Sequence, residues 1–136
     1  MRIVSANLNG IRSANSKGFF EWLQTQKADL VCLQETRVQP EQLTEIMLKP
    51  EGFHSAFEFA ERLGYSGVGL YFRETPDRIQ EGIGWSEMDS EGRFIQADFG
   101  KLSVVSLYLP SGSSGAHRQN FKYKLMDYFE KWLLEA

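Results

Sequence analysis

The sequence has very little of what marks secreted, zinc-binding or membrane proteins. Its 136 residues include one cysteine, Cys32, and two histidines, so an intrachain disulfide and a cysteine–histidine zinc site are both excluded. The longest uncharged apolar run is far shorter than the roughly 18 residues that indicate a membrane span. The first residues lack the basic-then-apolar pattern of a signal peptide. These absences predict a cytoplasmic protein without a membrane partner.

An excess of positive charge is also missing, because 15 Lys and Arg residues face 18 Asp and Glu residues for a net charge of −3. Proteins held on nucleic acid by charge alone are usually basic, so bulk charge gives no support for such a partner. It still permits an enzyme that gathers a few arginines along one groove. The chain is 42% hydrophobic and 13% aromatic, which is typical of a folded domain and excludes general disorder.

The hydrophobic pattern predicts an α/β protein with about seven strands and two substantial helices. The helices are expected at 17–26 and from about 117 to the end, with a shorter one at 40–48. The apolar run 30–33 shows no alternation, which is typical of a strand buried on both faces. The expected strands are 2–8, 30–33, 53–57, 68–72, 78–83, 93–99 and 102–109. We expect one mixed β-sheet with helices packed on one face.

The second face of this predicted sheet has no expected cover. The stretches 30–33 and 104–109 are apolar on both sides of the pleat, yet the helices account for only one side. Monomers seldom expose contiguous apolar patches beyond about 300–600 Å². We therefore expect a chain that forms part of a longer protein and that associates as a homodimer through the exposed sheet face.

Three residues near predicted strand ends are candidates for chemistry. Glu35 follows the apolar run 30–33 and Gln34 at the carboxyl end of a central strand, where catalytic groups of α/β proteins gather. The alternative is a solvated carboxylate in the next turn or helix start. Asn7 ends the first strand, and the turn dipeptide is Asn9-Gly10, so a turn role does not account for it. Tyr108 ends a later strand, with a packed core tyrosine as its alternative.

Two weaker signals accompany these residues. The Ser- and Gly-rich loop at 111–115 could bind phosphate through backbone N–H groups, although it lacks the Lys-Ser/Thr ending of a P-loop. Several arginines follow strand ends and could line one rim, although scattered arginines are usually solvated.

Five short motifs follow one another through the chain: SANLNGIR at 5–12, DLVCLQETR at 29–37, GYSGVG at 64–69, DSEGRFI at 89–95 and SLYLP at 106–110. Together, and in this order, they resemble the exodeoxyribonuclease III (apurinic/apyrimidinic endonuclease) branch of the endonuclease/exonuclease/phosphatase family. The resemblance implies one half of a four-layered α/β sandwich, with residues 1–136 as the N-terminal half of the domain. The family's later Asp and His motifs would lie beyond this chain.

The resemblance also implies a function. Members of this branch are magnesium-dependent (or manganese-dependent) DNA repair nucleases that hydrolyse phosphodiesters 5′ to abasic sites and degrade double-stranded DNA from 3′ ends. By resemblance, Glu35 is the metal ligand, Asn7 supports the metal site, and Tyr108 is the active-site tyrosine beside the phosphate. The positions matching DNA-contacting residues are Arg12, Arg37, Tyr65 and Arg93.

Three interpretations remain open from the sequence. The first is the nuclease just described, with this chain inactive by itself because the groups that activate water lie elsewhere. The second is a phosphatase or other phosphoesterase of the same superfamily. The third is a non-catalytic interaction module. Convergence of the arginines with Glu35 would favour the nuclease.

Overall fold

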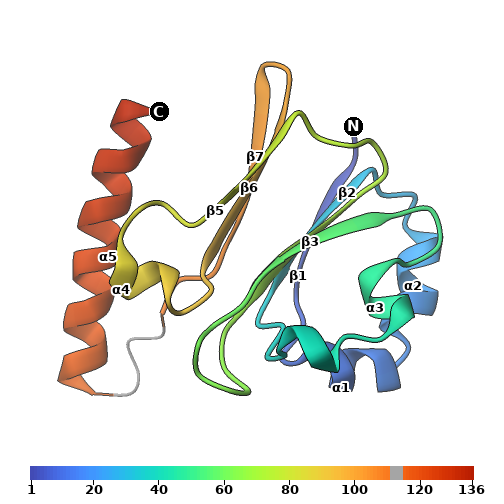
Figure 1. The fold of residues 1–136 in the computed structure, drawn as a ribbon, viewed down its shortest axis with the longest axis horizontal. Helices are drawn as coiled ribbons and strands as arrows, with labels where there is room; N and C mark the ends of the chain where they lie inside the picture. The colour runs from blue at the N-terminus through green and yellow to red at the C-terminus, as the bar shows by residue number, and fades with distance from the viewer. Residues whose placement is uncertain (111–114) are drawn as a thin grey trace.

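The computed structural model describes residues 1–110 and 115–136, which form two β-sheets with helices outside them (Figure 1). Residues 111–114 of the loop at 111–115, a weak phosphate-binding signal in the sequence, lie outside the described residues. The elements are β1 (Ile3–Asn7), α1 (Ile11–Ser16), α2 (Phe19–Thr25), β2 (Leu30–Gln34), η1 (Pro40–Gln42), α3 (Glu45–Leu48), β3 (His54–Glu58), β4 (Val68–Phe72), β5 (Arg78–Glu81), α4 (Ser86–Asp89), β6 (Phe94–Phe99), β7 (Leu102–Leu107) and α5 (Ala116–Glu135).

The first sheet is mixed and has the strand order β1-β2-β4-β3. β1 runs parallel to β2, whereas β4 is antiparallel to both β2 and β3. One face of this sheet packs against α1, α2 and α3, which lie together beside it (Figure 1). The α/β class and a mixed sheet with helices on one face are therefore confirmed. The core between these layers is formed by Leu8, Ile11, Phe20, Leu23, Ala28, Val31, Leu33, Val38, Met47, Phe53, Phe57 and Tyr71.

The prediction of a single sheet is wrong, because β5, β6 and β7 form a separate antiparallel sheet. This second sheet packs on the other face of the first sheet. Both facing surfaces are apolar, so packing them together removes both from water. The two-residue turn at Gly100-Lys101 joins β6 to β7 as an antiparallel hairpin. The shared core is formed by Leu30, Cys32, Val68, Leu70, Phe72, Ile95, Ala97 and Val104.

This second sheet also removes the reason for expecting a homodimer through an exposed sheet face. Leu30 and Leu70 are 1% and 0% exposed, and Val104 is 8% exposed. Among the described strand residues, the large apolar side chains that reach solvent include Ile3 and Leu102, on the edge strands β1 and β7. The chain covers the inner face of its own first sheet.

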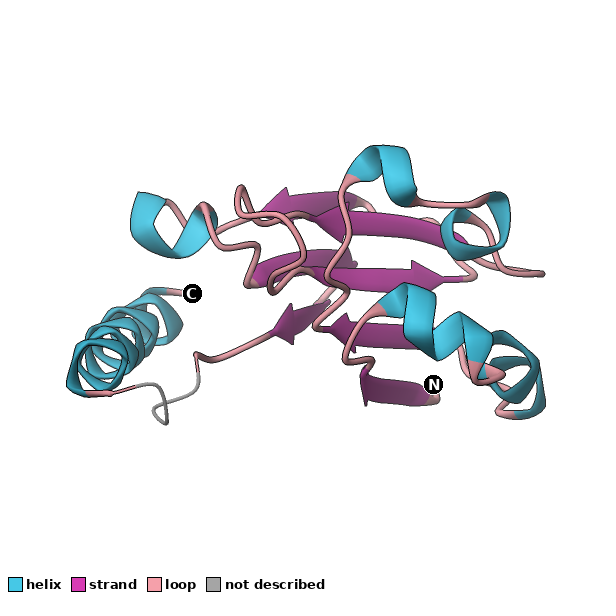
Figure 2. Ribbon diagram, turned by 90° about the horizontal axis from the view of Figure 1, so that it is seen from below, coloured by secondary structure: helices cyan, strands magenta, loops and turns pink. Residues whose placement is uncertain are grey.

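The outer face of the second sheet is covered by α4 and α5 (Figure 2). The described residues therefore form four layers, helices on each side of two packed sheets, whereas the sequence predicted one sheet with one layer of helices. Buried Phe94 and Leu125 join this sheet to α5, with Trp132 edge-on to Phe94 at 5.1 Å between ring centres. The expectation that the helices lie on one face only is corrected by this layer. None of the helices within 1–110 and 115–136 combines the length and apolar character needed to cross a membrane.

The predicted helix at 17–26 is confirmed as α2, whereas the predicted helix at 40–48 is divided in the structure. Gly18 adopts a φ of 89° and separates α1 from α2, a conformation that glycine takes without steric cost. Leu43 and Thr44 are extended, so a 3₁₀ turn and a short α-helix replace one continuous helix. Neither α1 nor α4 was predicted, because helices of six and four residues are too short for periodicity to show.

Candidate active site

Glu35 occupies the first position after β2, and backbone contacts hold it there. Its carbonyl accepts a 2.8 Å hydrogen bond from the Gly10 N–H, and the next residue, Thr36, donates to the Gly67 carbonyl at 3.1 Å. Glu35 has a φ of 54°, in the left-handed region that non-glycine residues rarely adopt. Such a conformation persists only where its surroundings enforce it. The fold therefore fixes this carboxylate, whose side chain is 15% exposed.

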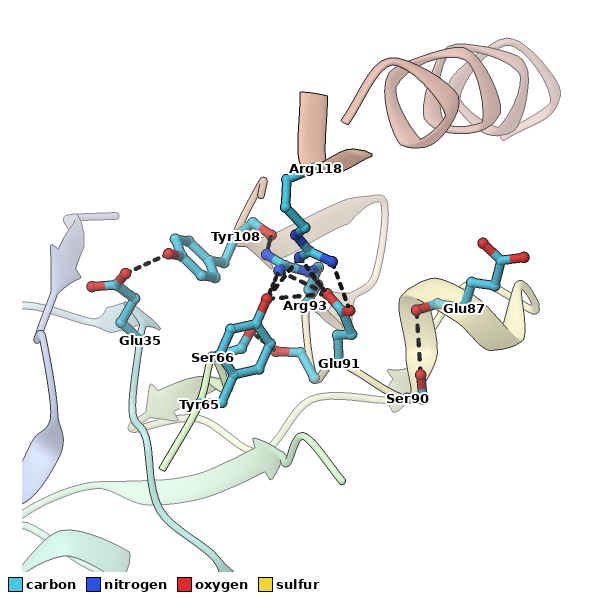
Figure 3. A network of polar contacts seen from close by, with 10 residues as sticks. Glu35, Tyr65, Ser66, Glu87, Ser90, Glu91, Arg93, Tyr108 and Arg118 are labelled. Atoms are coloured by element: carbon cyan, nitrogen blue, oxygen red, sulfur yellow. Dashed lines mark hydrogen bonds and ion pairs between the residues drawn. The ribbon is translucent and has the colours of Figure 1, made fainter. Parts of the chain in front are cut away.

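Tyr108 occupies the matching position after β7, and its hydroxyl donates a hydrogen bond to Oε1 of Glu35 (Figure 3). Two of the three candidate residues from predicted strand ends therefore meet in the structure. Burial, this hydrogen bond and the negative charge of Glu35 raise the pKa of Tyr108 to about 12, although the nearby charge of Arg93 opposes the shift. The phenol is consequently protonated at neutral pH and remains a hydrogen-bond donor.

A polar bridge between the sheets brings these strand ends together. Ser106, fully buried on β7, donates from Oγ to the Leu33 carbonyl on β2 at 2.8 Å. Gln34 donates from Nε2 to the Ser106 Oγ at 3.2 Å and to the Ser5 Oγ on β1 at 3.1 Å. These hydrogen bonds join the carboxyl ends of β1, β2 and β7, one or two residues before Asn7, Glu35 and Tyr108.

Asn7 lies at the same end of the first sheet. It pairs with Gln34 in the parallel ladder, directly before Glu35, and its side chain is exposed. Its Oδ1 accepts a 3.0 Å hydrogen bond from the Asn9 N–H, which fixes the orientation of the amide. An amide oxygen has two lone pairs, so Oδ1 keeps one for a further donor or a cation.

Arg12 and Arg37 line one polar pocket of about 370 Å³, together with Asn9, Gly10, Ser13 and Gly64. Nη2 of Arg37 also lies 3.7 Å from Oε1 of Glu35. Arg12 in α1 and Arg37 in the segment after β2 are separated by 25 positions in the sequence but meet at this pocket, and Arg37 also lies beside the Glu35 carboxylate. An anionic ligand at Glu35 would therefore meet positive charge from this pocket.

The remaining two residues predicted to contact DNA, Tyr65 and Arg93, form hydrogen bonds within the protein. The Arg93 side chain is 1% exposed, so it does not offer its guanidinium to a ligand at the surface. The half-buried Tyr65 hydroxyl receives hydrogen bonds from Arg93 Nη2 at 2.8 Å and Arg118 Nη2 at 2.7 Å. The structure thus buries Arg93 away from a ligand at the surface, whereas the half-buried Tyr65 has these contacts within the protein and its contact with DNA stays a prediction.

Glu91 and Arg118 complete this internal network, which the sequence did not assign (Figure 3). Oε1 of Glu91 lies 2.8 Å from Arg93 Nη2 and 3.1 Å from Arg118 Nη2. Burial acts to raise the pKa of Glu91, but hydrogen bonds from Arg118 and Arg93 outweigh it, and the pKa is lowered overall. The only sequence signal was the motif at 89–95, which contains both Glu91 and Arg93.

The donor set around Glu35 suits a magnesium ion that keeps most of its water. Within the described part of the chain, no group of three or more His, Cys, Asp or Glu side chains could hold a metal ion. Mg²⁺ in phosphate-transfer sites is commonly held by one or two carboxylates, substrate phosphate and several waters. One carboxylate, with an amide oxygen at the neighbouring strand end, matches that sparse arrangement.

Comparison with known proteins places this geometry in a family. Residues 4–135 match the Endonuclease/Exonuclease/phosphatase family. The chain belongs to this family. It is 33% identical over 136 residues to an exodeoxyribonuclease of Bacillus subtilis, with 99% of this chain and 53% of the relative covered. It is 34% identical over 128 residues to a DNA-(apurinic or apyrimidinic site) endonuclease of Dictyostelium discoideum, with 93% of this chain and 35% of the relative covered.

Solved structures of the family show the same fold. An AP endonuclease from Archaeoglobus fulgidus superposes with a TM-score of 0.84 at 26% sequence identity. That match covers 100% of this chain and 52% of the archaeal chain. The chain thus spans about half the length, or less, of these three relatives.

Proposed function

We propose that this chain belongs to a magnesium-dependent DNA repair nuclease that hydrolyses phosphodiester bonds at abasic sites and at 3′ ends of duplex DNA. The observation that carries the proposal is the contact between Glu35 and Tyr108 beside the pocket lined by Arg12 and Arg37. The similarity to the Bacillus exodeoxyribonuclease and the Dictyostelium DNA-(apurinic or apyrimidinic site) endonuclease supports the same activity class. A cytoplasmic location remains a prediction.

Each residue has a distinct part in this proposal. Glu35 holds Mg²⁺ or Mn²⁺, and the Asn7 amide supports the ion from the neighbouring strand end. The ion, when bound, supplies positive charge to the phosphate oxygens and to the leaving 3′ oxygen. Tyr108 places its hydroxyl oxygen beside the phosphate while its single phenolic hydrogen bonds Glu35, and its raised pKa keeps that hydrogen in place. Arg12 and Arg37 bind the DNA backbone, which is the sequence-independent part of recognition.

The chain by itself is expected to be inactive. Hydrolysis needs a group that activates water and a group that stabilises the leaving oxygen. Glu35 is not part of a larger acidic or histidine cluster among the described residues, so one carboxylate would have to serve alone. A single carboxylate also binds magnesium weakly, and we expect millimolar rather than micromolar affinity.

The experiment combines DNA cleavage with a magnesium titration. The purified chain is incubated with a duplex containing one abasic site and with Mg²⁺, beside a Glu35→Ala control. We expect no nicking above the control, together with millimolar Mg²⁺ shifts in NMR amide signals near Glu35 that are absent from the control. Magnesium shifts that persist in Glu35→Ala would remove Glu35 as the ligand. Nicking by the chain above the control would overturn its predicted inactivity.

The phosphatase alternative is tested in the same assay. A duplex with a 3′-phosphate and a small phosphomonoester replace the abasic duplex, and binding is measured as well as turnover. Binding of the abasic duplex that depends on Arg12 and Arg37 supports the nuclease. Preference for the phosphomonoester without such dependence supports the phosphatase.

A further inference from the structure

Arg93 is a buried arginine whose charge is satisfied entirely within the fold. Its side chain is 1% exposed, and burying an unpaired guanidinium would be very unfavourable. Nε donates to Glu91 Oε1 at 2.9 Å, and Nη2 lies 2.8 Å from the same oxygen. Nη2 also donates to the Tyr65 hydroxyl at 2.8 Å. Glu91 and Tyr65 therefore fix one side of the guanidinium.

The other side of the same guanidinium faces Tyr108. Nη1 of Arg93 donates to the Tyr108 carbonyl at 3.1 Å, and the Tyr108 N–H donates to the Arg93 carbonyl at 2.9 Å. The guanidinium carbon also lies 5.0 Å from the centre of the Tyr108 ring, within the range of a cation–π contact. Arg93 thus contacts both the backbone and the ring of Tyr108, whose hydroxyl points to Glu35.

From these contacts we infer that Arg93 is a positioning residue: its buried guanidinium holds the Tyr108 ring so that the phenolic hydroxyl meets Glu35. The inference rests on the proposed function for its purpose, because it concerns the tyrosine assigned to the phosphate. A planar guanidinium with five donors can serve Glu91, Tyr65 and Tyr108 together, whereas a lysine ammonium cannot reproduce that fork.

Arg118 provides a matched control from the same network. Its Nη2 donates to the Tyr65 hydroxyl at 2.7 Å and to Glu91 Oε1 at 3.1 Å, so it shares two of the three partners of Arg93. Its cation–π contact is with Phe121, 4.8 Å from the ring centre. Loss of Arg118 should therefore disturb Tyr65 and Glu91 and spare Tyr108.

The test observes Tyr108 directly, without DNA. The full chain is labelled with tyrosine carrying ¹³C at Cζ, which gives one signal for each of its five tyrosines. Tyr108→Phe and Tyr65→Phe identify the two signals of interest. Glu35→Ala provides the Tyr108 chemical shift without its acceptor. Amide spectra of every variant establish that the fold is retained.

In Arg93→Gln, we expect the Tyr108 signal to move at least halfway toward its position in Glu35→Ala. In Arg118→Gln, we expect the Tyr65 signal to move while the Tyr108 signal stays at its wild-type position. Arg93→Lys keeps the charge without the fork and is expected to shift Tyr108 as well; it replaces Arg93→Gln if that variant does not fold. A Tyr108 signal unmoved in a folded Arg93 variant would overturn the inference. Failure of the proposed function would appear in the DNA assays and leave this result unchanged.

Discussion

The Tyr108 hydroxyl donates a hydrogen bond to the Glu35 carboxylate from the opposite sheet, across 73 positions of sequence. Each residue directly follows a strand, β2 for Glu35 and β7 for Tyr108. The contact therefore exists only when the two sheets are packed at the correct register. Packing of the inner core and assembly of the candidate site are one event, so the following predictions address both.

Ser106→Ala should destabilise the fold through the bridge between the sheets. The variant removes the hydrogen bond from the fully buried Ser106 hydroxyl to the Leu33 carbonyl and leaves the half-buried Gln34 amide without one of its acceptors. A buried polar group left unsatisfied costs about 1–3 kcal/mol. Urea unfolding should show that loss. Ser103→Ala is the matched control, since that exposed hydroxyl bonds Asp98 and its removal should cost under about 1 kcal/mol. Equal effects of the two substitutions would contradict the proposed bridge.

Gly92→Ala should be among the most harmful small substitutions in this chain. Gly92 has a φ of 58°, and an added Cβ would lie 2.6 Å from the Ala60 backbone nitrogen. Gly100 has a nearly equal φ of 61° with open space around it, so Gly100→Ala isolates the conformational strain. We expect a loss of about 1 kcal/mol at Gly100 and a clearly larger loss at Gly92. Thermal unfolding that ranks the two variants equally would show that the loop relaxes without cost.

Arg12→Ala and Arg37→Ala should each weaken binding to an abasic duplex, measured by fluorescence anisotropy in EDTA. Both residues line the polar pocket beside Glu35, and each lost phosphate contact should reduce the slope of log affinity against log salt by about 0.9. We expect the double variant to bind roughly tenfold more weakly at low salt. Arg78→Ala, on an exposed position of β5, is the charge-matched control and should bind as wild type. A slope identical in all variants would exclude the pocket as a DNA contact.

Glu58→Gln should change how stability depends on pH. Burial, followed by the charges of Glu81 and Asp89, raises the pKa of Glu58 from 4.5 to about 7. Because the folded state favours the protonated carboxyl, stability from this group is full below about pH 4.5 and is lost as pH rises to about 7. Glu58→Gln should therefore be more stable than wild type at pH 8, by on the order of 1 kcal/mol after allowance for solvent screening. Unfolding curves at pH 4 and pH 8 should show the advantage only at pH 8.

The sequence by itself determined the elements that carry the candidate site. The unbroken apolar run 30–33 identified β2 as a strand buried on both faces, and its end identified Glu35. Tyr108 was located in the same way, by its place near the end of a predicted strand and before Pro110. These features are local, since they depend on hydrophobic periodicity and on turn residues that neighbouring positions reveal.

Only the tertiary structure decided which strands share a sheet and which arginines face solvent. An apolar face shows that a strand needs cover, but not whether a helix, another sheet or another copy provides it; here Ile95, Ala97 and Val104 of the second sheet do. Likewise, the motif that contains Arg93 does not reveal that Glu91 and Tyr65 pair with it in the interior. Both outcomes depend on contacts between segments distant in sequence, whose geometry no local pattern encodes.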